Sequence, residues 1–404
     1  MLGSNHHSTK LQNRSLVLKI ICTRTNVSRI DIARQTGLSK MSITNIVSEL
    51  ISDGLVVEQT GQTAAKNGSI GRKPVFLSPG ADRHLAIGLY ISRDHATATL
   101  SNLKCEILCE KRCAFEFEES EISFTDKIKS LVHSVLDTGV ASDKKIIGIG
   151  VASIGPLDIE NGIILEPPNF HKLKSIPIGN ILEKEFKCAV YTDNDMNAAA
   201  LAEKLYGKAV NISDFAYVGV TNGIGSGIIA DNTLFAGDMG FSGEIGHTSI
   251  NFEGPKCACG NAGCLELYAN IPEIVSQAGK SIILGMDSGL SELDEIVWTD
   301  IIKYAGAGDK LALNLIDRLC LYISIGLVNL INMFDPQIIY LGHDIALAGN
   351  LVTERLQSYL KDKTISSRYK SVPVEISAFG DKSPIIGSIA IVMDKLFNGV
   401  IPGF

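Results

Sequence analysis

The feature that most constrains this chain is a short segment with three cysteines and a histidine, namely His247, Cys257, Cys259 and Cys264. Neutral imidazole nitrogen and thiolate sulfur form the ligand set of a closed tetrahedral Zn²⁺ site. Gly260 and Gly263 would let the backbone turn so that the last cysteine reaches an ion held by the first two. We therefore expect a structural zinc ion whose four positions are filled by protein. The alternative is a loop of free thiols in which His247 is a hydrogen-bonded core histidine.

The other cysteines bear on the cellular compartment. The chain has nine cysteines in 404 residues, and the six outside this segment form no group with histidine. Cys105, Cys109 and Cys113 are expected to be small apolar side chains in a strand. The sequence shows no N-terminal apolar segment with a cleavage site and no run of 18 apolar residues. We therefore expect a soluble, cytoplasmic protein with reduced thiols and no membrane insertion.

Charge is distributed unevenly along the chain. Residues 1–80 contain ten Lys or Arg and four Asp or Glu, a formal charge of +6, whereas the whole chain carries −7. A basic N-terminal part on an acidic body indicates that only the N-terminal part contacts a polyanion. Residues 1–10 show no periodicity, and we expect a flexible tail there.

Three helical patterns follow one another in the basic part. The first covers residues 14–23, and the second begins with a capping-box pattern at Ser28 and Asp31 and ends before Gly37. Ser39 can cap the third, in which apolar residues recur at three- and four-residue spacing from Ile43 onward. The glycine turn between the second and third patterns is typical of a helix-turn-helix.

The third helix and the hairpin after it carry the side chains expected to contact DNA. Short polar side chains at the first turn suit a helix that enters the major groove, and two apolar runs on either side of residues 61–71 predict a β-hairpin wing. The candidate contacts are Ser39, Lys40, Ser42, Thr44, Asn45, Arg72 and Lys73. We interpret residues 1–80 as a winged helix-turn-helix domain. The alternative is a three-helix protein-interaction module with a solvated polar face.

The remaining chain alternates between strand-length apolar runs and helical patterns. Runs at 85–89, 97–100, 146–152, 190–192, 215–220 and 337–341 are interleaved with helical patterns such as 197–206 and 317–334. This alternation predicts an α/β architecture with parallel strands. Glycine turns at the strand ends, including residues 223–227, would form the ligand crevice.

Polar residues mark this crevice and indicate its ligand. They are Asn169, Asn194, Asp195, Glu244, His247 and Glu266. Carboxylates, amides and a ring nitrogen with few aromatics suit a neutral, hydroxyl-rich ligand such as a sugar, because a buried polar group without a partner costs about 1–3 kcal/mol. Each of them could also be a cap or turn residue. We favour Asp195 as a ligand contact and Asp193 as the helix cap.

Three motifs in this chain resemble the ROK family (repressors, open reading frames and sugar kinases) over nearly its whole length. They are Asn194-Asp195-Met196-Asn197-Ala198-Ala199, Gly243-Glu244-Ile245-Gly246-His247 and Cys257-x-Cys259-Gly260-x-x-Gly263-Cys264-x-Glu266. The chain most resembles the sugar-repressor branch of the NagC and XylR type. The resemblance implies a two-lobed, actin-like (ribonuclease H-like) ATPase body with a sugar cleft between the lobes. It also implies zinc on His247, Cys257, Cys259 and Cys264, and sugar contacts at the six crevice residues.

The resemblance divides the chain into three parts. We expect a DNA-binding domain at residues 1–80 and a first α/β lobe at 81–195, completed by a C-terminal helix at about 384–404. The second lobe, at 196–383, would hold the zinc site and the dimer contacts.

The nucleotide side of the expected cleft departs from the family pattern. In the kinase members, the aspartate matching Asp195 is the general base that takes the proton from the attacking sugar hydroxyl. Residues 90–94 lack the acidic residue and both glycines of the Asp-x-Gly-Gly-Thr loop, residues 221–225 depart from the Gly-Thr-Gly opening, and Gly342-His343-Asp344 interrupts a glycine pair. We therefore expect a sugar sensor and no enzyme. The alternative is an ATP-dependent hexose kinase, with Asp195 as base, that carries a DNA-binding head.

The expected partners follow from these assignments. They are operator DNA, a sugar or sugar phosphate effector, and a second copy of the chain in a homodimer or dimer of dimers. The expected function is sugar-responsive regulation, by repression, of carbohydrate metabolism genes. A third interpretation is a repressor that has lost sugar binding and is controlled by a transport-system protein docked on its body.

Overall fold

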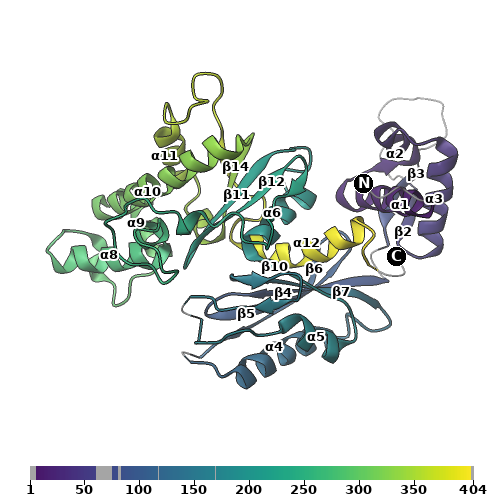
Figure 1. Ribbon diagram of the computed structural model, residues 1–404, viewed down its shortest axis with the longest axis horizontal. Helices are drawn as coiled ribbons and strands as arrows, with labels where there is room; N and C mark the ends of the chain where they lie inside the picture. Colours follow the sequence, from purple (N-terminus) through teal and green to yellow (C-terminus); the bar gives the residue numbers. More distant parts are fainter. Residues whose placement is uncertain (1–5, 61–74, 81–82, 117, 169, 402–404) are drawn as a thin grey trace.

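The computed structural model describes residues 6–60, 75–80, 83–116, 118–168 and 170–401, and the account below concerns these residues. An N-terminal part of three helices lies against one end of a body with two α/β lobes (Figure 1). The lobes are built on separate five-stranded sheets, and the last helix of the chain runs between them and the N-terminal part. This confirms the expected α/β architecture of the body.

The N-terminal part consists of α1 (His6–Thr23), α2 (Arg29–Thr36) and α3 (Lys40–Ser52) with a sheet ordered β1 (Val27–Ser28), β3 (Val75–Pro79), β2 (Val56–Thr60). The predicted capping box is present, because the side chains and backbone N–H groups of Ser28 and Asp31 bond to each other. Gly37, with φ of 71°, ends α2 as predicted. The tail expected over residues 1–10 is wrong in part, since α1 already begins at His6.

The predicted hairpin is present as an antiparallel pair. Strand β2 pairs with β3 from Val56 opposite Pro79 to Thr60 opposite Val75. Residues 61–74, which include the candidate contacts Arg72 and Lys73, lie outside the described part of the chain. The predicted hairpin is therefore confirmed, while the positions of Arg72 and Lys73 stay a prediction.

The first lobe is built on a mixed sheet that is covered on both faces. Its strands are β10 (Val190–Asn194), β7 (Lys145–Ser153), β4 (His84–Ile91), β5 (His95–Asn102) and β6 (Ile107–Ala114), in that spatial order. The first three run parallel, and β5 and β6 continue antiparallel. Helices α4 (Glu121–Leu136) and α5 (Ile178–Phe186) cover one face, and α12 (Ser383–Phe397) covers the other (Figure 1). A short hairpin, β8 (Leu157–Asp158) and β9 (Ile163–Ile164), lies beside it.

The second lobe repeats this plan around another sheet. Its spatial order is β13 (Thr233–Leu234), β12 (Ile224–Ala230), β11 (Phe215–Val220), β14 (Ile338–Gly342), β15 (Val374–Ile376). Helix α6 (Asp195–Tyr206) packs on one face. The other face packs against a helical layer of α7 (Glu266–Ala269), α8 (Ile271–Ile283), α9 (Trp298–Gly306), α10 (Lys310–Phe334) and α11 (Asn350–Leu360). Short 3₁₀ helices are η1 (Ile245–His247), η2 (Gly289–Glu292), η3 (His343–Ala348) and η4 (Gly380–Lys382).

One sequence-based expectation about this lobe is wrong. Residues 223–227 were expected to form a glycine turn, but the turn ends at Gly223 and Ile224 already begins β12. The glycines serve close packing instead, because a Cβ on Gly227 would lie 2.4 Å from the carbonyl oxygen of Met196 in α6. Absence of a side chain lets the helix backbone approach the strand, which is a separate use of glycine from turn formation.

Helices α6 and α12 join the two lobes to each other and to the N-terminal part. They pack so closely that a Cβ on Gly387 would lie 2.6 Å from the carbonyl carbon of Ala198. Just beyond α12, Gly399 lies against Leu11 and Ser15 of α1. A single apolar cluster of buried residues therefore extends from the N-terminal helices through α12 to α6.

Helix α10 is long and apolar enough to cross a membrane by length and composition alone. Within its most apolar window, 56% is buried inside the protein. Its buried positions, including Leu319, Ile323 and Leu327, belong to the core of the second lobe. A helix that contributes so much to a core is adequately explained as a core helix.

Candidate functional site

A cleft of about 440 Å³ lies between the lobes and brings together the residues predicted to bind a ligand. Its lining includes Asn194 of β10, Asp195 of α6, Glu244 of a loop, His247 of η1 and Glu266 of α7. A second hollow of about 1150 Å³ adjoins it and shares Glu244 and His247. Asn169, the sixth predicted contact, lies outside the described residues.

Strand β10 and helix α6 position the first two of these side chains. Asn194 caps α6, because its Oδ1 accepts a hydrogen bond from the Met196 N–H at 2.9 Å. Asp195 occupies the first turn of the helix and is only 4% exposed. The expectation that Asp193 is the cap is wrong. Its Oδ1 instead accepts from the Asn194 N–H and the Asn197 side chain, which fixes the strand–helix junction.

The loop after β13 turns Glu244 into the cleft. Gly243 has φ of 85° and lies so close to β12 that a Cβ there would be 2.0 Å from the Ser226 carbonyl oxygen. Only glycine meets both demands at this position. The surroundings raise the pKa of Glu244, chiefly by removing water from its carboxylate, and the nearby Asp195 and Glu266 carboxylates raise it further.

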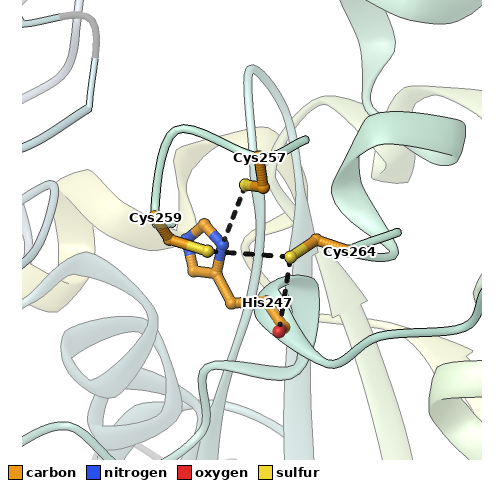
Figure 2. Close-up of side chains that lie close together, drawn as sticks. All are labelled: His247, Cys257, Cys259 and Cys264. Carbon is orange, nitrogen blue, oxygen red and sulfur yellow. Dashed lines mark hydrogen bonds between the residues drawn. The ribbon is translucent and has the colours of Figure 1, made fainter. Parts of the chain in front are cut away.

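The His247 and cysteine side chains meet in one group, as the sequence predicted (Figure 2). Their candidate ligand atoms all lie within 4.8 Å of one another. The Cys257 Sγ lies 3.7 Å from His247 Nδ1, and the Cys259 Sγ lies 3.7 Å from the Cys264 Sγ. Sulfurs about 2.3 Å from a tetrahedral zinc ion would be about 3.8 Å apart, so the donor set fits this metal.

The loop around the cysteines explains how they converge. Gly260 and Gly263 have φ of 93° and 65°, and a Cβ on Gly263 would lie 1.7 Å from the Asn251 carbonyl oxygen. The predicted glycine turns are therefore present. If His247 ligates a metal through Nδ1, its Nε2 is the nitrogen left to serve the cleft.

At the opposite end of the cleft, three polar side chains bond to one another. Between β4 and β5, the Ser92 hydroxyl donates to Asp94 Oδ1 at 2.8 Å and lies 2.7 Å from His95 Nδ1. Hydrogen bonds from His95 and Ser92 hold the pKa of Asp94 well below its usual range. The side chains of Ser92, Asp94 and His95 therefore bond to one another, whereas Arg93 Nε in the same turn has no hydrogen-bond partner among the described residues.

Two cleft residues were not recognised as contacts from the sequence. Tyr90 lies in β4 and belongs to the cleft lining. The sequence placed Tyr90 near the end of a strand, but it did not show which face of that strand borders the cleft. His343 was seen only as an interruption of a glycine pair, yet it lines the cleft beside Asp195. The signal that could have found it is a histidine directly after the apolar strand β14.

The described candidate DNA contacts lie at the start of α3. Lys40, Thr44 and Asn45 are exposed, with the capping residue Ser39 beside them, and Ser42 is half-buried. The Thr44 hydroxyl donates to the Lys40 carbonyl at 2.8 Å, and the Ser42 hydroxyl lies 2.9 Å from that of Ser39. These hydroxyls have partners within the helix, so Lys40 and Asn45 are better placed to reach outward.

An apolar side chain was missed on the same surface. Met41 is 71% exposed at the first turn of α3. The sequence-based list included only polar residues, although apolar contact with a thymine methyl group is a regular means of reading bases. The periodicity of α3 placed Met41 off the buried face and could have identified it.

Salt bridges neutralise part of the charge in residues 1–80. Each of the four acidic residues pairs with a cation: Lys10 with Glu49, Arg14 with Asp53, Arg29 with Glu58 and, at 3.9 Å, Arg34 with Asp31. The formal excess of +6 therefore resides on other side chains, of which Lys40 is exposed on α3. The others include Arg72 and Lys73.

The chain matches known proteins over nearly its full length. The family model described as ROK family matches residues 86–395. A xylose repressor of Caldicellulosiruptor bescii is 32% identical, with 98% of both chains covered. The DNA-binding transcriptional dual regulator NagC of Escherichia coli is 29% identical, with 97% of this chain and 95% of that protein covered.

A solved structure extends this similarity to the fold. The ROK family transcriptional regulator described as a homologue of the E. coli Mlc protein has a TM-score of 0.82 at 28% identity, covering 97% of this chain and 98% of that one. The two-lobed body expected from the sequence is thereby confirmed as that of these regulators, and the match includes the N-terminal part. The chain belongs to the ROK family.

Proposed function

We propose that this protein is a sugar-responsive transcriptional repressor of carbohydrate metabolism genes. The observation that carries the proposal is the combination of an intact polar cleft with an N-terminal part that matches full-length regulators. We assign DNA binding to residues 1–80, one lobe to 81–195 with 384–404, and the other to 196–383. The protein would act in the cytoplasm, where its operator DNA is found.

The proposed effector is a sugar or sugar phosphate bound between the lobes. Asn194, Asp195, Glu244, His247 and Glu266 supply the paired donors and acceptors that hydroxyl groups need, with Asn169 as a further contact. Zinc on the His247 and cysteine group would be structural, because protein atoms fill a tetrahedral set. Its task would be to hold the wall that carries His247 and Glu266.

The proposed DNA contact uses the first turn of α3 in the major groove. Lys40 and Asn45 would reach bases or phosphates, with Ser39, Ser42 and Thr44 closer to the helix end, and Arg72 and Lys73 would contact DNA from the hairpin. A homodimer or dimer of dimers would present two such helices to a pseudo-palindromic operator. The spacing of the two helices is then what the effector must change.

The contacts of α6 and α12 support a route for this change. Asp195, in the first turn of α6, lines the cleft, and beyond the other end of that helix Asn211 accepts a hydrogen bond from Arg24 at 3.2 Å. Helix α12 packs on α6 and also contacts α1. A sugar that favours one arrangement of the lobes would therefore favour one arrangement of the N-terminal parts.

The test combines DNA and sugar binding on the full-length protein. A binding site is selected from a random duplex library, and its affinity is measured by fluorescence anisotropy with and without D-xylose, D-glucose and N-acetyl-D-glucosamine and their phosphates. We expect one of them to weaken DNA binding at least tenfold, and to lose this effect in Asp195→Asn. If sugars bind and DNA affinity stays constant, the effector role is wrong. If none binds while the DNA is held, control by a transport-system protein is favoured.

The kinase alternative makes an opposite prediction. A coupled ATP assay on the same hexoses is expected to give no turnover, because the Ser92 hydroxyl is hydrogen-bonded to Asp94 and His343 stands beside Asp195. Turnover that Asp195→Asn abolishes would make the protein an enzyme with a DNA-binding head.

A further inference from the structure

His343 is a buried histidine in the cleft for which the proposed sugar site has so far no task. It begins η3 directly after β14 and is 3% exposed. Its Nε2 lies 3.6 Å from Asp195 Oδ2, too far for a hydrogen bond, and has no hydrogen-bond partner among the described residues. Buried polar atoms in native proteins nearly always have a partner, so this nitrogen is placed to meet a ligand.

The ring is oriented so that this nitrogen is a donor. The other ring nitrogen, Nδ1, lies 2.9 Å from the hydroxyl of Tyr217, a fully buried residue. A lone pair on Nε2 would face the negative charge of Asp195, so the favoured tautomer carries its proton on Nε2. The Tyr217 hydroxyl then donates to Nδ1 and holds the ring in place.

The surrounding backbone is adapted to the imidazole. His343 has φ of 61°, in the left-handed region that favours glycine, although glycine is not the residue found here. Gly219 on the neighbouring strand makes room, because a Cβ there would lie 2.6 Å from His343 Nδ1. Beyond it, the Trp298 Nε1–H donates to the Asp344 carbonyl at 2.8 Å and holds η3. Strain held by its surroundings in a ligand cleft indicates a functional role.

We propose that His343 Nε2 and the Asp195 carboxylate bind one hydroxyl group of the effector sugar between them. The hydroxyl donates to Asp195 Oδ2 and accepts from His343 Nε2. Their separation of 3.6 Å leaves an oxygen able to lie about 2.8 Å from both atoms. This inference rests on the proposed sugar sensing and assigns one more residue to it, and that residue selects among sugars by their hydroxyl pattern.

The same contact explains why the hydroxyl would be recognised and left unreacted. Phosphoryl transfer needs an open path from the attacking oxygen to the phosphate, in line with the leaving oxygen. When His343 Nε2–H donates to this hydroxyl, it occupies a lone pair of the oxygen. In a kinase, that oxygen would attack the phosphate after the aspartate had taken its proton. The hydroxyl oxygen that a kinase would phosphorylate is here the atom by which the protein distinguishes one sugar from another.

The experiment measures sugar affinity of the full-length protein by calorimetry. D-xylose, D-glucose and N-acetyl-D-glucosamine are titrated first, and the tightest of them is followed by its monodeoxy analogues. We expect His343→Gly to weaken binding of the parent sugar by up to about tenfold, the upper end of the scale for a hydrogen bond between neutral groups. For one deoxy analogue, the loss of affinity relative to the parent should be about tenfold greater in wild type than in His343→Gly, where that hydroxyl keeps only its bond to Asp195.

Two further variants separate this role from general damage. His343→Asn keeps a donor and suits the same backbone conformation, so it should retain more affinity than His343→Gly. Asp362→Gly changes another residue with positive φ, 62°, in an exposed turn, and should leave sugar affinity unchanged. Equal affinity of wild type and His343→Gly, or equal losses with every analogue in both, would overturn the inference. If neither the three sugars nor their phosphates bind wild type, the proposed sugar sensing itself fails.

Discussion

The two ends of the cleft differ in how they satisfy their polar groups. At the end proposed to bind the sugar, called the sugar end below, Asp195, Glu244 and Glu266 line the space between the lobes, and their neighbours are backbone turns and the His247 and cysteine group. At the other end, Ser92, Asp94 and His95 bond to one another. An end with unused donors and acceptors can hold a ligand, whereas one whose groups are already paired offers little to a phosphate chain. The comparison teaches that the two ends of one cleft can differ in how many polar side chains remain unpaired and able to meet a ligand.

The largest expected effect comes from removing the metal group. Cys259→Ser should release zinc and destabilise the protein by about 3–5 kcal/mol, because a structural metal contributes its binding energy to the folded state. Zinc content by mass spectrometry and thermal unfolding with and without a chelator would measure this. Cys109→Ser, on β6 and outside the group, is the matched control and should change little. Unchanged zinc content in Cys259→Ser would show that the sugar end is held together without this ligand.

The second effect tests whether Asp195 belongs to the sugar end. Asp195→Asn should weaken sugar binding by about 2–3 kcal/mol, the cost of losing hydrogen bonds to a charged acceptor, and leave DNA affinity without sugar unchanged. Calorimetry and anisotropy on the same preparation measure both. Equal sugar affinity in the variant would contradict the assignment of this end.

A third, smaller effect concerns the scaffold behind the sugar end. Burial raises the pKa of Asp193 to about 6. A carboxyl whose pKa is raised in the folded state destabilises the protein when it is ionised. The contribution of Asp193 to the free energy of unfolding is therefore most favourable below about pH 4 and falls as the pH rises to about 6. Asp193→Asn keeps an acceptor oxygen for Asn194 and Asn197. It should therefore stabilise the protein by on the order of 1 kcal/mol at pH 8 and lose this advantage near pH 4.

Chemical denaturation at several pH values measures this difference. The control is Asp158→Asn, since hydrogen bonds from Asn161 lower the pKa of Asp158 and should give the opposite trend, with wild type favoured at neutral pH. A destabilised Asp193→Asn at pH 8 would show that the ionised carboxylate supports the junction.

The smallest expected effect is at the end lined by Ser92, Asp94 and His95. Magnesium ATP or a non-hydrolysable analogue at millimolar concentration should shift the melting temperature by less than about 1 °C, because a ligand stabilises only in proportion to its binding to the native state. A shift of several degrees would break the comparison and reopen the kinase interpretation. The tightest sugar of the panel provides the positive control.

Local signals in the sequence were sufficient where one short segment determines the geometry. The caps at Ser28 and Ser39 and the convergence of the cysteines needed only neighbouring residues and two glycines. The sugar-end residues converge because strand ends and loops of an α/β body meet at one crevice, which motif resemblance anticipated.

The sequence-based predictions failed where contacts between distant segments of the chain determine the role of a residue. Gly225 and Gly227 looked like a turn, yet they allow α6 to lie on β12, and that contact cannot be read from spacing. The cap assigned to Asp193 went to its neighbour because Asn197 engages the aspartate. The task of His343 depends on Gly219 and Tyr217, more than 100 residues earlier in the chain.

Helix α6 is a rigid rod that extends from the cleft toward the N-terminal part. Its 12 residues span about 18 Å at 1.5 Å per residue. Asp195 lies at its N-terminal end, and the opposite end lies near the segment that holds Arg24. A rotation of about 5° about the Asp195 end would displace the far end of such a rigid rod by about 1.5 Å. If a bound sugar rotates α6 in this way, the displacement would be largest next to the N-terminal helices, and shortening α6 by one turn would reduce it.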